Sequence, residues 1–315
     1  MAASYREIDY RIRPGKHAER LMMVEAFRRL QFGSLESYQY IGLGSVYFSD
    51  FRLFHRALGM TKMVSVEKAA HDRKRFEANI PYGCIEMSWG DTASELPKID
   101  LGVRSIIWLD YDGRLSKSIL GDIREVAGRA AGGTVLAVTV QSKYDRSTGD
   151  DGGDRSLAVI QESLGLDRIP IETTPQQLRG IGTGHLFRDV IIEEITRSIS
   201  DRNAARHPGQ HMKFRQFIHF GYEDGVRMMT VGVIFYDAGQ EGLLGQCRFE
   251  DLSFYRDGSD TFEIVIPKLT PREIGFLESQ MPRSFDTVDL AAIPPKDAKQ
   301  YTNIYRYFPN TTFIE

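Results

Sequence analysis

The sequence feature that most constrains this chain is a short apolar strand that runs into a glycine turn. Residues 38–45 read Tyr-Gln-Tyr-Ile-Gly-Leu-Gly-Ser, and the apolar stretch from Val46 to Leu58 that follows is predicted to be a helix. A glycine turn between a buried strand and a helix lets a ligand approach the backbone closely, because no Cβ stands in the way. We therefore expect a ligand site at this turn.

Strands and helices alternate on both sides of this turn. Four further strands are predicted from runs of apolar and β-branched residues, at 62–67, 84–88, 104–109 and 134–140. Helices are predicted at 16–30, 69–79, 115–131, 155–164 and 185–197. Such alternation predicts an α/β fold, a Rossmann-like doubly wound and mainly parallel sheet that is covered on both faces.

The second half of the chain has a different pattern. Two strands are predicted at 214–221 and 226–236, and the Asp224-Gly225 pair between them indicates an antiparallel hairpin. A later strand at 262–266 precedes Thr270, which with Glu273 predicts a capping box. We therefore expect three parts: a basic segment and cap helix at 1–37, a Rossmann-like domain at 38–240, and a small α+β appendage at 241–315.

Composition excludes several classes of protein. The chain has 315 residues, 42% of them hydrophobic, and a net charge of -3, which is typical of a globular protein without a general affinity for nucleic acid. Cys84 and Cys247 lie far apart, so we expect reduced thiols and no structural zinc. The sequence shows neither a signal-peptide pattern nor an apolar run of the ~20 residues that cross a membrane, which predicts a cytoplasmic protein without a membrane partner.

Acidic residues follow three of the predicted strands. Glu67 ends the second strand, Asp91 comes just after the third, and Asp110 follows the fourth. The carboxyl ends of parallel strands meet at one edge of a sheet, which is where such folds bind ligands. The three acids and the glycine turn are therefore predicted to share one site.

The familiar nucleotide motifs do not fit this turn. A dinucleotide fingerprint requires a third glycine where the chain has Tyr47, and no Gly-Lys-Ser/Thr follows for a P-loop. The order of the motifs, over about 38–237, resembles that of class I S-adenosylmethionine-dependent methyltransferases. In that family a glycine turn follows strand one, acids follow strands two and three, and an acidic motif, here Trp-Leu-Asp-Tyr-Asp-Gly at 108–113, ends strand four. The whole chain is similar to a group of uncharacterised bacterial O-methyltransferases.

The resemblance implies S-adenosylmethionine as the cofactor and methyl transfer to an unknown oxygen or nitrogen nucleophile as the activity. It also implies a role for each matching residue: the cofactor would be held by Gly42, Gly44, Ser45, Glu67, Asp91 and Asp110. Glu67 would accept hydrogen bonds from the ribose hydroxyls, and Asp91 would face the adenine amine. Asp110 or Asp112 would act as general base or orient the nucleophile, and Tyr111 would line the site.

Two positions in the glycine turn depart from the family pattern. Tyr40 stands where an acid usually precedes the first glycine, and Val46 stands where a third glycine is usual. The amine end of the cofactor would then lack its expected partner. An alternative follows: the chain is a catalytically inactive, methyltransferase-like binding or regulatory subunit of a multi-component bacterial system, with a protein partner or as a homodimer.

Four further questions stay open at this level. No metal is expected, although Asp110, Asp112 and Asp145 offer oxygen atoms that could hold Mg²⁺. Nucleic acid is a weaker candidate substrate, because basic residues cluster only in the N-terminal helix and in 201–215. The loop at 141–156 is either a lid or a surface connection. The arginines of helix 16–30, among them Arg20, form either a solvated basic face or a cap that contacts an anionic substrate.

Overall fold

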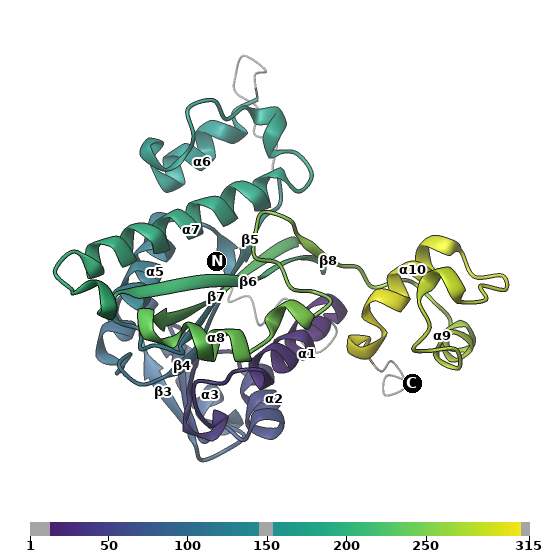
Figure 1. Cartoon of the computed structure of the whole chain (residues 1–315), viewed down its shortest axis with the longest axis horizontal. Coiled ribbons are helices and arrows are strands. Elements are labelled where there is room, and N and C mark those ends of the chain that lie inside the picture. Colours follow the sequence, from purple (N-terminus) through teal and green to yellow (C-terminus); the bar gives the residue numbers. More distant parts are fainter. Residues whose placement is uncertain (1–12, 145–153, 310–315) are drawn as a thin grey trace.

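An eight-stranded sheet forms the centre of the computed structural model, which describes residues 13–144 and 154–309 (Figure 1). The strands are β1 Gln39–Leu43, β2 Lys62–Glu67, β3 Ile85–Trp89, β4 Ser105–Arg114, β5 Val135–Gln141, β6 Met212–Glu223, β7 Arg227–Asp237 and β8 Phe262–Ile264. They lie in the order β3-β2-β1-β4-β5-β7-β6-β8. The first five strands are parallel, and β7 runs antiparallel to both β5 and β6. This order confirms the predicted Rossmann-like sheet and its antiparallel hairpin.

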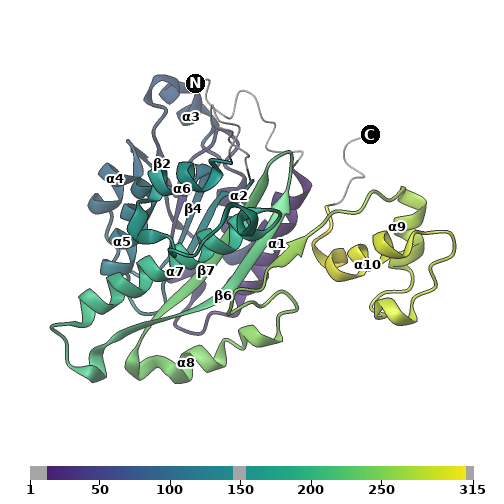
Figure 2. The ribbon, with the colours of Figure 1, turned by 90° about the horizontal axis from the view of Figure 1, so that it is seen from above.

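Helices cover both faces of this sheet (Figures 1 and 2). The helices are α1 Pro14–Arg28, α2 Ser49–Leu58, α3 Arg73–Asn79, α4 Thr92–Glu95, α5 Lys117–Arg129, α6 Ser156–Leu164, α7 Gly182–Asn203, α8 Glu241–Gln246, α9 Pro271–Glu278 and α10 Pro295–Ile304. On one face Phe27 of α1 packs against Phe54 of α2, and Phe54 stacks on Trp108 of β4. On the other face α5 and α7 bury Ile123 and Ile191 against β4, β5 and β7. The sheet thus separates two apolar cores, which explains the nearly continuous apolar runs of its central strands.

Local signals set several of the element boundaries. Helix α2 begins three residues later than predicted, because the chain first turns through Phe48, whose φ of 48° is left-handed. Gly225 closes the β6–β7 hairpin with a φ of 85°, which suits glycine at the predicted Asp-Gly turn. The capping box of Thr270 and Glu273 is confirmed at the start of α9.

The C-terminal segment contributes to the sheet before it leaves it. β8 pairs in parallel with β6, so part of the predicted appendage at 241–315 extends the main sheet. Beyond it, a small separate core surrounds Leu277 and Tyr301, and α9 and α10 lie to one side of the sheet (Figures 1 and 2). The hydroxyl of Tyr307 donates to Glu25 of α1 and ties this part back. Our division into three domains remains a prediction.

None of the helices in residues 13–144 and 154–309 combines the length and the apolar character needed to cross a membrane. The predicted loop at 141–156 falls largely on 145–153, which lie outside the described residues, as do Asp145 and most of the basic segment before Arg13.

Phe54 offers a test of the core beneath α1. Its ring is fully buried and contacts Tyr40 at 4.9 Å and Trp108 at 6.0 Å between ring centroids. We expect Phe54→Ala to lower the free energy of unfolding by about 3–5 kcal/mol, since it removes these contacts and leaves a cavity. Urea denaturation measures this. The exposed Ile171 provides the control, because Ile171→Ala should change stability by less than about 0.5 kcal/mol.

Candidate functional site

The carboxyl ends of β1, β2 and β4 meet at one edge of the sheet, beside α1. β1 lies between β2 and β4, with Leu43 opposite Val66 and Gly42 opposite Trp108. The glycine turn, Glu67 and the end of β4 are therefore neighbours at this edge.

Gly44 keeps the space beside Ser65 and Glu67 open. Its backbone N–H donates to the Val66 carbonyl at 2.7 Å. A Cβ at this position would lie 2.8 Å from Ser65 Oγ and 3.2 Å from Glu67 Oε2. Ser65 Oγ is itself buried and finds no hydrogen-bond partner among residues 13–144 and 154–309. A cradle that a Cβ would fill and an unpartnered hydroxyl at its wall fit a polar ligand at this point.

Gly42 has a different reason to lack a side chain. A Cβ there would lie 2.6 Å from the hydroxyl of Tyr40, two residues earlier on the same face of β1. The absence of a side chain at Gly42 therefore accommodates Tyr40. Ser45 follows in the turn, half-buried, and its carbonyl accepts from Phe48 N at 3.1 Å.

Glu67 ends β2 with its carboxylate held in a defined position. The residue is only 9% exposed, and one oxygen accepts from the backbone N–H of Ala69 at 2.7 Å. Burial raises the pKa of Glu67, the Ala69 hydrogen bond opposes this rise, and the nearby Asp112 adds to it. The second oxygen faces Gly44. A fixed carboxylate with an oxygen on the ligand side suits the recognition of hydroxyl groups.

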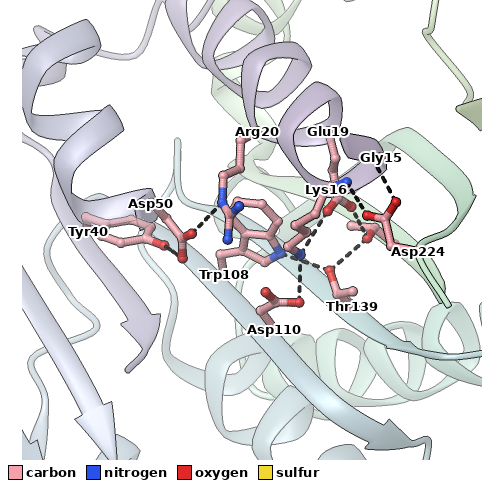
Figure 3. A network of polar contacts seen from close by, with 11 residues as sticks. Gly15, Lys16, Glu19, Arg20, Tyr40, Asp50, Trp108, Asp110, Thr139 and Asp224 are labelled. Carbon is pink, nitrogen blue, oxygen red and sulfur yellow. Dashed lines mark hydrogen bonds and ion pairs between the residues drawn. The ribbon is translucent and has the colours of Figure 1, made fainter. Parts of the chain in front are cut away.

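A buried ammonium group holds Asp110 at the end of β4 (Figure 3). Lys16 Nζ lies 2.7 Å from Asp110 Oδ1 and 2.8 Å from Glu19 Oε2, and the side chains of Lys16 and Glu19 are 1% and 0% exposed. The ammonium also sits 4.2 Å from the centre of the Trp108 ring. Burial raises the pKa of Asp110, and Lys16 opposes that rise. Asp110 retains 21% exposure of its side chain, so it can still meet a ligand.

A chain of hydrogen bonds fixes Glu19 and hence Lys16. Trp108 Nε1 donates to Thr139 Oγ1 at 2.9 Å, and Thr139 lies 2.7 Å from Thr230 between hydroxyl oxygens. Thr230 in turn contacts Glu19 Oε1. An indole N–H only donates and a carboxylate only accepts, so the Thr139 hydroxyl donates to Thr230 and the Thr230 hydroxyl donates to Glu19. Glu19 pairs with Lys16, and Lys16 pairs with Asp110, which lies two residues after Trp108 on β4. We call this set of contacts the hydrogen-bond circuit.

A second ion pair joins α1 to α2. Arg20 Nε donates to Asp50 Oδ1 at 2.7 Å, with both side chains largely buried. The hydroxyl of Tyr40 lies 3.4 Å from the other oxygen of Asp50. Burial opposes the charged form of Arg20, but Asp50 and Asp110 raise its pKa above the ordinary value. Arg20 therefore does not belong to a solvated basic face.

The remaining predicted site residues have different surroundings. Tyr111 projects to the opposite side of the sheet from Asp110, as alternation along a strand requires, and its hydroxyl donates to Asp122 Oδ2 at 2.6 Å. Asp91 is exposed and caps α4 by accepting from Ser94 N at 2.8 Å. Asp112 is exposed, near Glu67.

Metal ligands and a basic patch receive no support from the described residues. Within 13–144 and 154–309, no three His, Cys, Asp or Glu side chains are grouped as a metal site would require. In the basic stretch 201–215, Arg202 donates to the Ala127 and Ala130 carbonyls and Lys213 pairs with Glu241 at 2.7 Å. These two cations thus have structural partners.

Comparison with known proteins identifies the family. Residues 8–315 match the family model described as "Putative O-methyltransferase". The chain belongs to this family. It matches no curated protein sequence.

Solved structures with a similar fold include two methyltransferases. Trm1 from Pyrococcus horikoshii, solved with S-adenosyl-L-methionine, is 11% identical with a TM-score of 0.46, and the match covers 73% of this chain and 57% of that one. The O-methyltransferase TomG from Streptomyces achromogenes, in complex with SAM, is 12% identical with a TM-score of 0.36, over 68% of this chain and 78% of that one. The chain thus spans little more than half of the Pyrococcus protein.

Sequence reasoning on this O-methyltransferase family member did not identify Lys16, Glu19 or Asp50 as part of the site. Lys16 and Glu19 lie three residues apart at the start of a helix, a spacing that is common on solvated helix faces. Asp50 lies in the first turn of a helix, where an acidic residue is common because it complements the helix dipole. The one sequence signal for a buried charge was that charged and apolar residues are mixed along 14–28. In the structure this helix, α1, is buried over most of its length.

Thr230 tests whether the hydrogen-bond circuit stabilises the fold. Thr230→Val keeps the shape of the side chain but leaves Glu19 Oε1 without its donor, so we expect the free energy of unfolding to fall by about 1–3 kcal/mol. Chemical denaturation measures the change. Thr196→Val, on the exposed side of α7, is the control and should cost less than about 0.5 kcal/mol. Equal effects of the two substitutions would contradict the circuit.

Glu67 should carry a cost in stability that depends on pH. Because its pKa is raised by burial, the ionised form destabilises the folded state, and this penalty appears as the pH rises from the ordinary glutamate pKa through the raised value. We expect Glu67→Gln to have a higher Tm than the wild type at about pH 8 and a similar Tm at about pH 4. Thermal unfolding at the two pH values measures this. The exposed Glu86 on β3 supplies the matched control, and Glu86→Gln should change the Tm little.

Proposed function

We propose that this protein transfers a methyl group from S-adenosylmethionine to an oxygen or nitrogen nucleophile. The observation that carries the proposal is the cradle at the edge of the sheet: Gly44 without a side chain, the Ser65 hydroxyl, which has no partner among the described residues, and the fixed carboxylate of Glu67. Membership of an O-methyltransferase family supports it. The acceptor, a bacterial cytoplasmic setting and any protein partner or homodimer stay predictions from the sequence.

The residues at this edge fit such a cofactor in an ordered way. Glu67 would hold the ribose hydroxyls through its oxygen on the Gly44 side, and the turn at Gly42, Gly44 and Ser45 would pass close to the methionine part. Asp91 would meet the adenine amine, with one of its oxygens already used to cap α4. When bound, the cofactor supplies an activated methyl group for in-line displacement, so the protein's main task is positioning.

Asp110 is our candidate for orienting the acceptor. One of its oxygens is engaged by Lys16, which leaves the other to accept a hydrogen bond from a hydroxyl or an amine. The Lys16 ammonium favours the ionised carboxylate against the effect of burial. Asp112 is the second candidate for this role, and Tyr111, bonded to Asp122, would act by fixing the end of β4.

The alternative of an inactive subunit gains nothing from the described contacts. Val46 is buried in the core beneath α1, and Tyr40 packs against Phe51 and Phe54 at 4.9 Å between ring centroids. Both departures from the glycine motif thus have packing roles that are compatible with an open cradle at Gly44.

Calorimetric binding tests the proposal directly. We expect the wild type to bind S-adenosylmethionine and S-adenosylhomocysteine, and Glu67→Ala to weaken both by about 10- to 100-fold, since two hydrogen bonds to a charged group are lost. Glu86→Ala, on the exposed side of β3, should bind as the wild type does. Absence of binding to both compounds, or full binding by Glu67→Ala, would overturn the proposal.

A transfer assay separates the active enzyme from the inactive alternative. Cofactor with a labelled methyl group is incubated with the protein and with fractionated small molecules, nucleic acid and protein. Label in one fraction identifies the acceptor class. Cofactor binding without transfer to any fraction would favour the binding or regulatory subunit.

A further inference from the structure

Arg20 and Asp50 form an ion pair whose place in the fold is unusual for two surface-type residues. Arg20 comes from the second turn of α1 and Asp50 from the first turn of α2, and their side chains are 9% and 11% exposed. A buried pair of this kind gains little net stability, because removing both charges from water offsets their attraction. Stability alone therefore does not explain why this ion pair is buried here.

The position of the pair supplies one. Asp50 lies beside Tyr40, the residue that stands where the glycine motif normally has an acid, and the two are 3.4 Å apart between oxygens. The Tyr40 hydroxyl in turn lies beside Gly42. A carboxylate is thus present next to the glycine turn, supplied by the following helix instead of the strand.

Arg20 adds the opposite charge at the same place. Within the described residues its guanidinium donates hydrogen bonds through Nε, to Asp50, which leaves the two terminal nitrogens for another acceptor. Figure 3 shows Arg20 reaching down from α1 to Asp50 while Lys16, one turn earlier, reaches to Asp110. Asp50 and Asp110 both raise the pKa of Arg20, so its guanidinium lies close enough to interact with both carboxylates.

We propose that Arg20 and Asp50 together form the subsite for the zwitterionic amino-acid end of the methyl donor. Asp50 binds the ammonium group and Arg20 the carboxylate, so each charge of the pair meets the opposite charge of the ligand. A planar guanidinium with two free terminal nitrogens matches the two oxygens of a carboxylate. The inference rests on the proposed function and deepens it. It names a carboxylate that replaces the acid usually found at the position of Tyr40, which would bind the amine end of the cofactor.

Two ligands that differ only at this end provide the test. S-adenosylhomocysteine carries the amino-acid group, whereas methylthioadenosine has the same nucleoside and thioether sulfur without it. By calorimetry we expect Arg20→Met and Asp50→Asn each to lower the affinity for S-adenosylhomocysteine by about 10- to 100-fold. Methylthioadenosine should bind each variant within about twofold of the wild type, because it never reaches the subsite.

Controls separate binding from folding. Arg28→Met removes an exposed arginine from the same helix and should leave both affinities unchanged. Retained methylthioadenosine binding shows that a variant is folded. If Arg20→Met is too unstable to purify, Asp50→Asn alone tests the subsite. Arg20→Lys keeps the charge without the planar guanidinium. Its affinity for S-adenosylhomocysteine should therefore fall between those of the wild type and Arg20→Met.

The outcomes distinguish this inference from the function on which it rests. If the wild type binds S-adenosylhomocysteine and the two variants bind it equally well, the subsite assignment is wrong and the proposed function stands. Equal weakening of both ligands would also overturn the assignment. A wild type that binds neither S-adenosylmethionine nor S-adenosylhomocysteine would overturn both.

Discussion

The structure of the candidate site depends on one buried charge, the ammonium group of Lys16. An isolated ammonium in a protein interior is strongly unfavourable, so its burial requires anionic partners at short distance. Asp110 and Glu19 provide them at 2.7 and 2.8 Å, and the Trp108 ring covers a further side. These contacts hold the first turn of α1 against β4, and α1 thereby becomes a wall of the site instead of a separate cap.

The groups around this wall are arranged for a ligand more than for stability. Glu67 and Asp110 both have pKa values raised by burial, and the Ser65 hydroxyl has no hydrogen-bond partner in the part of the chain that the structure describes. The Arg20–Asp50 pair is buried as well. Each of these features is individually neutral or unfavourable for folding, and the two apolar cores on either side of the sheet offset them. Perturbed groups gathered at one edge of a sheet are typical of a functional site.

Most of the sheet could be predicted because burial leaves a periodic trace in the sequence. The central strands are apolar on both faces, and each of the predicted strands overlaps an observed one. Short helices were harder. α4 and α8 have too few residues for a periodic pattern. α10 was not predicted; Pro295 occupies its first helical turn, where proline is tolerated.

The sequence by itself determined the glycine turn and the placement of Glu67 and Asp110 at strand ends, because these depend on local pattern and on the geometry of parallel strands. Only the tertiary structure decided their neighbours. Lys16 meets Asp110 across 94 residues, Arg20 meets Asp50 across 30, and Thr230 meets Glu19 across 211. No local rule selects such partners, since packing α1 on the sheet is what removes water from these charges and forces them to pair.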